Sequence, residues 1–126
     1  MKTVLDASVI IDFLRRKDKL NSLYIQAVYK EIDFVMSGVT VTEVFSGASA
    51  QKGGEQNQEW ETILSGIEVR GVDIETARVV GKIKNVHRLS LGDAFVAALA
   101  LEENLPLATL DSRDFKKIKG LKLYKF

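Results

Sequence analysis

Five acidic residues stand beside apolar runs of the sequence, at points where a helix or a strand would begin or end. Asp6 follows the first apolar run and Glu43 lies one turn into a helical pattern. Asp93 heads the segment AFVAALAL, and Asp111 and Asp114 come after LPLATL. Carboxylates bind hard cations and take part in proton transfer. Their placement therefore raises the question of a hydrolytic metal site.

Each acid also has a simpler structural explanation. The segments Thr40–Glu43, Ser90–Asp93 and Asp111–Asp114 have the spacing of helix N-caps or capping boxes, and Asp6 could cap a helix in the same way. An acid in the first turn of a helix is also favoured by the helix dipole, by about 0.3–1 kcal/mol. Taken one at a time, these acids are better explained as caps.

Alternating helical and strand patterns predict an α/β fold. Predicted strands cover residues 2–5, 34–36, 67–72, 105–110 and 121–126, the last as an edge strand. Predicted helices cover residues 9–14, 20–32, 40 to about 53, 60–67, 74–83 (capped by Asp73) and 94–101, the last apolar on every side. Strands separated by helices need crossover connections. We therefore expect residues 1–126 to form one domain, a three-layer α/β/α sandwich with a central, mainly parallel sheet.

Taken together, the acids indicate more than caps. In an open parallel sheet the ligand crevice lies at the carboxyl ends of the strands, so acids that follow successive strands converge there. Several carboxylates in one crevice repel one another unless a proton or a cation offsets their charge. Oxygen ligands alone favour Mg²⁺ or Mn²⁺. Such ions activate water for the cleavage of phosphodiesters.

The composition excludes several other chemistries. The 126 residues include no cysteine, so disulfides, thiolate nucleophiles and cysteine-bound zinc are ruled out. His87 is the only histidine, which excludes mechanisms that need two imidazoles in one chain. No apolar run reaches the roughly 18 residues of a membrane span. We expect no membrane association and a cytoplasmic location, with which the lack of cysteine is compatible.

Three motifs resemble those of a known family. VLDASVIIDFL, VTVTEVFSGA and LSLGDAFVAALALEENLPLATLDSRDF occur in this order and are similar to the motifs of the PIN domain. Within that family the chain most resembles the small VapC-type toxins of toxin–antitoxin pairs. The resemblance spans nearly the whole chain, because GLKLYKF also looks like the family's last strand.

The resemblance implies a Mg²⁺- or Mn²⁺-dependent endoribonuclease. Asp6, Glu43 and Asp93 fall on the three acidic positions of the family, as catalytic residues and metal ligands. Asp111 is the first choice for the fourth acid because it directly follows a predicted strand, and Asp114 is the alternative.

Other polar and aromatic residues have more open interpretations. The hydroxyls of Ser8 and Thr109 could orient a ligand or a bound water, or satisfy local backbone groups. Asp12 lies more than one helical turn from Asp6, so we interpret it as a surface or partner-facing acid. His87 is expected to be a solvated residue of a polar linker rather than a catalytic one, and Trp60 to lie in the core or an interface rather than to stack on bases.

The net charge of +1 hides a segregation of charge along the chain. Residues 113–126 contain six basic residues and one acid, whereas residues 55–75 contain six acids and one arginine. A basic rim beside an acidic site is what an RNA backbone requires, although a solvated lysine-rich terminus is an equal alternative. The candidate RNA-binding residues are Arg15, Arg16, Lys17, Lys116 and Lys117.

The leading hypothesis is therefore a toxin that cleaves RNA. The resemblance also implies a homodimer and a cognate VapB-like antitoxin that covers the acidic cleft. A PIN-like housekeeping ribonuclease and a non-catalytic interaction module remain as alternatives. A phosphohydrolase with Asp6 as nucleophile is disfavoured, since that chemistry usually needs a second acid where Ser8 stands. A dinucleotide-binding domain is weaker still, because no G-x-G-x-x-G follows the first strand.

Overall fold

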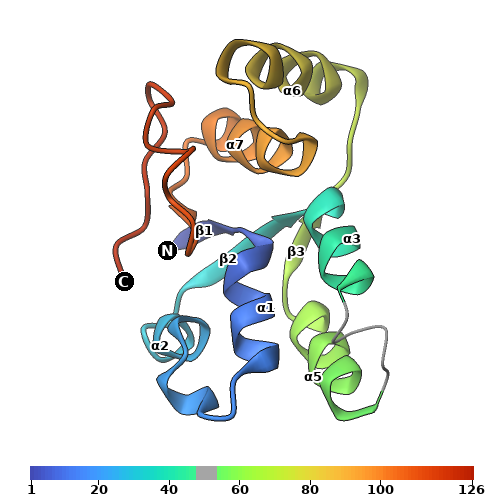
Figure 1. Cartoon of the computed structure of the whole chain (residues 1–126), viewed down its shortest axis with the longest axis vertical. Coiled ribbons are helices and arrows are strands. Elements are labelled where there is room, and N and C mark those ends of the chain that lie inside the picture. Colours follow the sequence, from blue (N-terminus) through green and yellow to red (C-terminus); the bar gives the residue numbers. More distant parts are fainter. Residues whose placement is uncertain (48–53) are drawn as a thin grey trace.

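A parallel four-stranded sheet forms the centre of the molecule in a computed structural model that describes residues 1–47 and 54–126 (Figure 1). Its strands are β1 (Lys2–Leu5), β2 (Asp33–Ser37), β3 (Glu68–Arg70) and β4 (Leu107–Ala108). They lie in the order β3-β2-β1-β4, and every pairing is parallel. The predicted strand over residues 67–72 is confirmed but is shorter than expected.

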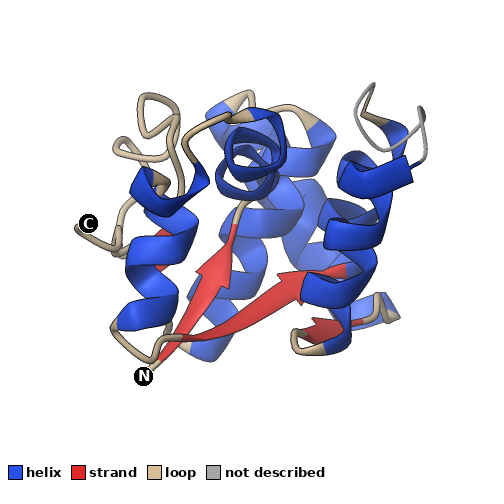
Figure 2. Ribbon diagram, turned by 90° about the horizontal axis from the view of Figure 1, so that it is seen from below, coloured by secondary structure: helices blue, strands red, loops and turns tan. Residues whose placement is uncertain are grey.

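Helices cover both faces of this sheet, which confirms the three-layer sandwich (Figures 1 and 2). The helices are α1 (Ala7–Arg15), η1 (Lys19–Asn21, a 3₁₀ turn), α2 (Leu23–Tyr29), α3 (Gly38–Ser46), α5 (Gly54–Ser65), α6 (Ile74–His87) and α7 (Leu91–Glu103). One apolar cluster joins the sheet to α6 and α7, and the other joins it to α1, α2, α3 and α5. Successive strand residues point to opposite faces, so Val4 belongs to the first cluster and Leu5 to the second.

Helix α7 is buried along most of its length, as its apolar sequence predicts. Alanines and valine at 94, 96, 97, 98 and 100 are at most 1% exposed. The helix packs on the sheet and on α6 at the same time, so its exposed residues lie near its ends, at Leu91 and Glu102. Small side chains allow that close approach. Trp60 of α5 is also completely buried, in edge contact with Phe45, so its predicted place in the core is confirmed.

The helix predicted over residues 20–32 is divided into two pieces. Ser22 separates η1 from α2 because its side chain accepts a hydrogen bond from the backbone N–H of Ile25 and so starts a new helix. Helix α2 ends at Tyr29, and Glu31 adopts a positive φ of 59° that no helix continues. The predicted helical conformation is confirmed on both sides of Ser22, but the cap formed by Ser22 was not predicted.

Helix α3 begins at Gly38, two residues earlier than predicted. The Ser37 hydroxyl accepts from the backbone N–H of Val39 and caps the helix. Thr40 is therefore not an N-cap: it lies inside the helix and is fully buried, so the predicted Thr40–Glu43 capping box is wrong. The helix ends at Ser46, and the predicted end near residue 53 falls on residues 48–53, outside the described residues.

The predicted C-terminal edge strand is reduced to one bridge. Leu107 donates to the carbonyl of Lys122 and accepts from the N–H of Tyr124, each at 2.8 Å, and pairs with Leu123 in parallel. β4 is too short to support more.

Of three further predictions at helix ends, one is confirmed and two are wrong. The predicted cap of α6 is confirmed, because the Asp73 carboxylate accepts from the backbone N–H of Thr76 at 2.8 Å. His87 is the last residue of that helix and is half-buried, so its placement in a polar linker is wrong. The Asp111–Asp114 segment forms turns and caps no helix.

Candidate active site

The candidate site lies where the order of the strands reverses. The chain runs from β1 outward to β2 and β3, and then returns to place β4 on the other side of β1. Ligands of open parallel sheets bind at the carboxyl ends of the strands at such a switch point. Asp6 directly follows β1, and Thr109 directly follows β4. Residues a hundred positions apart therefore meet at this edge.

Asp6 is buried and is held by two hydroxyl groups. It is only 7% exposed. Its Oδ2 atom accepts hydrogen bonds from Ser8 Oγ at 2.9 Å and from Thr109 Oγ1 at 2.8 Å. Asp6 occupies the N-cap position of α1, yet its side chain makes no capping hydrogen bond. The simple explanation of this acid as a cap is therefore wrong.

Ser8 and Thr109 also connect the two sides of the switch point. Their hydroxyl oxygens lie 3.3 Å apart. Ser8 Oγ accepts from the backbone N–H of Leu110 at 3.0 Å, and Thr109 Oγ1 accepts from the backbone N–H of Asp111 at 3.1 Å. Both hydroxyls therefore satisfy backbone N–H groups and also bond to Asp6. Their predicted role in orienting a ligand or a bound water stays a prediction.

Glu43 reaches the site from α3. The residue as a whole is exposed, but its carboxylate lies against the first turn of α7, at Gly92. Burial of that carboxyl raises the pKa of Glu43, and the negative charges of Asp6 and Asp93 raise it further. The three acids therefore lie within electrostatic reach of one another.

Asp93 lies in the first turn of α7. Its backbone N–H donates to Ser90 Oγ at 3.2 Å, which confirms Ser90 as the N-cap of this helix. Burial raises the pKa of Asp93, followed by the charge of Asp6, while a hydrogen bond with Ser90 acts in the opposite direction. Smaller raising contributions come from Asp114 and Asp111. The pKa of Asp93 is thus influenced by Asp6, Asp111 and Asp114, and Asp93 in turn raises the pKa of Glu43.

Both candidates for the fourth acid are exposed and lie near Asp93. Asp111 is tied to Thr109 through its backbone N–H. Asp114 lies one turn further on and pairs with Lys117 at 3.9 Å. Asp12, in contrast, pairs with Arg16 at 2.9 Å along α1 and has no part in the electrostatic group.

The acids suit a hard cation in chemistry and charge. Their donors are all oxygen atoms, and each of Glu43 and Asp93 has a pKa raised by neighbouring carboxylates, a repulsion that a cation would relieve. Within residues 1–47 and 54–126, however, no three acidic or histidine side chains are already placed to hold one ion together. The donor set fits, and ligation would require the carboxylates to converge further.

A shallow groove runs from the site along one side of α1. It has a volume of about 510 Å³ and is lined by Ser8, Ile11, Asp12, Arg15 and Arg16. These positions recur at helical spacing, so the groove connects the hydroxyl that holds Asp6 to the basic end of the helix. Lys17 is exposed just beyond it, and Lys116 and Lys117 are exposed after β4.

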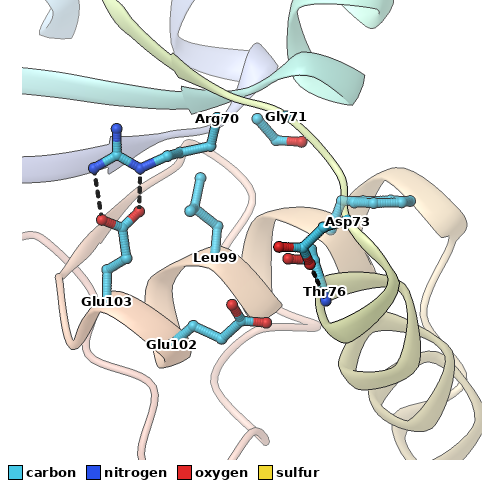
Figure 3. Close-up of a pocket in the computed structure, with 9 residues that line it drawn as sticks. Arg70, Gly71, Asp73, Thr76, Leu99, Glu102 and Glu103 are labelled. Carbon is cyan, nitrogen blue, oxygen red and sulfur yellow. Dashed lines mark hydrogen bonds and ion pairs between the residues drawn. The ribbon is translucent and has the colours of Figure 1, made fainter.

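A second cavity, which Asp6, Glu43 and Asp93 do not line, lies beside the C-terminal half of α7 (Figure 3). It has a volume of about 200 Å³ and contains none of the predicted site residues. Arg70 on β3 makes two parallel hydrogen bonds to Glu103, at 3.0 and 2.8 Å, across its wall. This pair joins the edge strand to α7 and has a structural role.

Gly92 is the site residue that sequence reasoning missed. A Cβ atom at this position would come within 2.7 Å of Glu43 Oε2. A glycine in the first turn of an otherwise strongly helical segment is the signal that could have revealed it, because glycine weakens helices.

None of the described helices is both long and apolar enough to cross a membrane.

The order of the strands and the helices on both faces of the sheet define a class of parallel, three-layer α/β proteins, and the comparisons with known proteins agree with this fold. Residues 3–121 match the PIN domain. The chain therefore belongs to the PIN domain family. No curated protein sequence matches it significantly.

Several solved structures share this fold. A chain of the VapBC2 complex from Rickettsia felis, bound to a fragment of promoter DNA, has a TM-score of 0.77 at 22% identity and covers 100% of this chain and 99% of its own. A chain of a toxin–antitoxin complex from Klebsiella pneumoniae has a TM-score of 0.75 at 25% identity, with coverages of 98% and 99%. PAE2754 from Pyrobaculum aerophilum has a TM-score of 0.68 at 21% identity, with coverages of 96% and 87%.

Proposed function

We propose that this PIN domain is a metal-dependent endoribonuclease and the toxin of a toxin–antitoxin pair. The observation that carries the proposal is the state of Asp6, a buried acid at the N-cap position that caps nothing and is instead oriented by Ser8 and Thr109. Two further acids, Glu43 and Asp93, are close enough for its charge to raise their pKa. Such an arrangement costs stability, and a cation at the cluster would offset that cost.

Asp6, Glu43 and Asp93 would hold Mg²⁺ or Mn²⁺, with Asp111 as the fourth acid and Asp114 as the alternative. Such an ion, when bound, makes a water molecule easier to deprotonate and stabilises negative charge on phosphodiester oxygens. Hydrolysis adds the oxygen of water to phosphorus and a proton to the leaving oxygen. No covalent nucleophile is required, which agrees with the lack of cysteine.

The hydroxyl pair would set the orientation of Asp6. Both hydroxyl bonds go to Oδ2. Among the described residues, no hydrogen bond reaches Oδ1, so Oδ1 is the oxygen available to a ligand. The two hydroxyls are in turn bonded to the backbone after β4. Rotation of the Asp6 carboxylate would therefore break its hydrogen bonds to Ser8, which follows β1, and to Thr109, which follows β4.

The groove along α1 would receive the RNA backbone. It leads from Ser8 to Arg15 and Arg16, over seven or eight helical residues, which is about 10–12 Å at 1.5 Å per residue. Guanidinium groups at that distance from the acids can bind phosphates beyond the scissile one. Lys17, Lys116 and Lys117 would add to this basic rim, which offsets the repulsion of RNA by the carboxylates.

The partner would be a VapB-like antitoxin. The similar chains from Rickettsia felis and Klebsiella pneumoniae belong to toxin–antitoxin complexes. A cationic side chain such as arginine on the partner could pair with the carboxylates and displace the metal. Under this proposal the protein acts in the cytoplasm as a homodimer. Coexpression with the product of the neighbouring gene, followed by copurification and native mass measurement, tests the partner and the dimer together.

The activity is tested by mapping cleavage sites on total RNA with and without Mn²⁺. The wild type should cleave at defined sites only when metal is present, and Asp93→Asn should not cleave. Glu102→Gln is the matched control: it removes one carboxylate at the other end of α7, about 14 Å away, and should cleave normally. Cleavage that persists in EDTA, or in Asp93→Asn, would contradict the proposal.

A non-catalytic interaction module is the second candidate, and one observation favours it: no three acids of the described chain are placed to share an ion. The two functions differ in metal binding. Calorimetric titration of the wild type with Mn²⁺ should show binding at or below millimolar concentration if the protein is a nuclease. An absence of binding would favour the interaction module.

A further inference from the structure

The contact between Glu43 and Gly92 is the tightest feature of the candidate site. A Cβ atom on residue 92 would lie 2.7 Å from Glu43 Oε2 and 2.8 Å from both Cδ and Oε1. Real Cβ atoms do not approach other heavy atoms so closely. All three atoms belong to the carboxylate, so this group occupies the space that any other side chain at residue 92 would fill.

The backbone at Gly92 does not require glycine. The residue is the second of α7, and its φ is not in the left-handed region that favours glycine. Alanine is a better helix former at such a position. The helix therefore gives up stability here, and what it gains is room for the Glu43 carboxylate beside Asp93.

We propose that Gly92 is a positioning residue for the acidic cluster: its missing side chain lets the Glu43 carboxylate rest on the first turn of α7, next to Asp93. Any larger residue would push the carboxylate away from the other acids while leaving the fold intact, because the displaced atoms are the end of a flexible side chain. The inference rests on the proposed function where it concerns metal binding, but the contact itself does not depend on it.

Gly92→Ala tests the inference, and the chain offers a matched control. Gly81 lies in the exposed part of α6, and a Cβ there meets nothing within 4 Å. Gly81→Ala should raise the melting temperature and leave Mn²⁺ binding unchanged. Gly92→Ala should weaken Mn²⁺ binding by about tenfold, the lower end of the effect of removing support from a metal ligand. RNA cleavage should then need more Mn²⁺ to reach half its maximal rate.

A double-mutant cycle with Glu43→Ala separates displacement of the carboxylate from a general effect on the helix. In EDTA, Gly92→Ala should raise the melting temperature more in the Glu43→Ala background than in the wild type, because no carboxylate then opposes the new methyl group. In Mn²⁺ titrations, Gly92→Ala should cause no further loss in the Glu43→Ala background.

Two results would overturn the inference: equal changes in melting temperature in both backgrounds, or unaltered Mn²⁺ binding by Gly92→Ala in an otherwise wild-type chain. If the wild type itself binds no Mn²⁺, the proposed function fails. The EDTA cycle still decides whether Gly92 positions Glu43, so the two failures are distinguishable.

Discussion

Asp6 stands at the N-cap position of α1, but its side chain bonds to two hydroxyl groups rather than to the helix backbone. An acid at an N-cap position normally stabilises its helix by about 1 kcal/mol through a hydrogen bond to the backbone. Asp6 makes no such bond and instead accepts hydrogen bonds from the hydroxyl groups of Ser8 and Thr109. Because Asp6 is buried and yet does not cap α1, its position is better explained by the proposed role in metal binding than by helix stability.

Removal of either hydroxyl should therefore affect activity more than stability. Ser8→Ala and Thr109→Val each delete one of the two bonds to Asp6, and we expect cleavage to fall by roughly tenfold. Each lost bond should cost about 1 kcal/mol of the free energy of unfolding. Thr42→Val is the control, because its hydroxyl bonds only to the carbonyl of Gly38 within α3. Cleavage rates and urea denaturation measure both effects, and normal cleavage by both site variants would contradict the role given to the hydroxyls.

Burial of Glu43 and Asp93, together with repulsion among the acids, should be visible in the stability of the metal-free protein. Because the pKa values of Glu43 and Asp93 are raised in the folded state, ionisation of these groups opposes folding. Their contribution to stability is therefore present at low pH and is lost as the pH rises from the ordinary carboxyl values near 4 through the raised ones.

Glu43→Gln and Asp93→Asn should then raise the melting temperature in EDTA at pH 7, by about 2–4 °C, while abolishing cleavage. The gain should vanish near pH 4, where the wild-type carboxyls are protonated too. Melting curves of each variant and of the wild type at the two pH values provide the measurement. Destabilisation by both variants at pH 7 would show that these carboxylates make favourable contacts.

At the scale of elements, the first turn of α7 connects stability to the site. Ser90 caps this helix and accepts the backbone N–H of Asp93. Ser90→Ala should lower the free energy of unfolding by about 1 kcal/mol and also weaken Mn²⁺ binding, because the turn that carries Asp93 frays. Ser22→Ala removes an equivalent cap from α2, outside the acidic group, and should lower stability alone. Equal metal binding by Ser90→Ala and the wild type would refute this link.

The order and type of most elements could be predicted because helical periodicity and short apolar runs alternate along the sequence. The failures are at element ends, where single side chains decide. Ser37 and Ser22 start helices at residues that apolar spacing does not mark. The C-terminal alternation LKLYKF does favour a strand, but a strand needs a partner. β4 offers only Leu107, and the extent of β4 depends on tertiary pairing with β1.

The place of Asp6 at the edge of the sheet could be predicted because it directly follows β1, whereas Glu43 and Asp93 lie on helices. A residue that follows a parallel strand is carried to one edge of the sheet whatever its side chain. The contacts between elements could not be predicted: the meeting of Glu43 with Gly92 depends on how α3 packs on α7. The choice between Asp111 and Asp114 also stays open, because both lie on an exposed turn near Asp93.

At the scale of the whole molecule, the segregated charge should govern how binding of RNA responds to salt. Replacement of Lys116, Lys117 and Lys119 by glutamine should weaken binding and flatten its dependence on salt. For single-stranded RNA the logarithmic slope changes by about 0.7 for each phosphate contact, so the loss of three contacts should reduce it by about 2.

Filter binding at several salt concentrations, with a catalytically inactive Asp93→Asn background, measures that slope. Lys30, Lys82 and Lys84 form a control set of equal charge: all three are exposed, and they lie on or beside α2 and α6. Their replacement by glutamine should leave the slope unchanged. An equal decrease for both sets would mean that only the net charge matters.

The hydrogen bond from Thr109 to Asp6 spans 103 positions of the sequence. During synthesis Asp6 leaves the ribosome well before Thr109, because Thr109 lies 103 positions further along the chain. A nascent chain therefore holds its acids without the hydroxyl that fixes the first of them, and β1 lacks one of its two neighbours until β4 emerges. The hydrogen bond that holds Asp6 therefore forms only after the segment that follows β4 has emerged, and under the proposed function a nascent chain that stops before this segment should not cleave RNA.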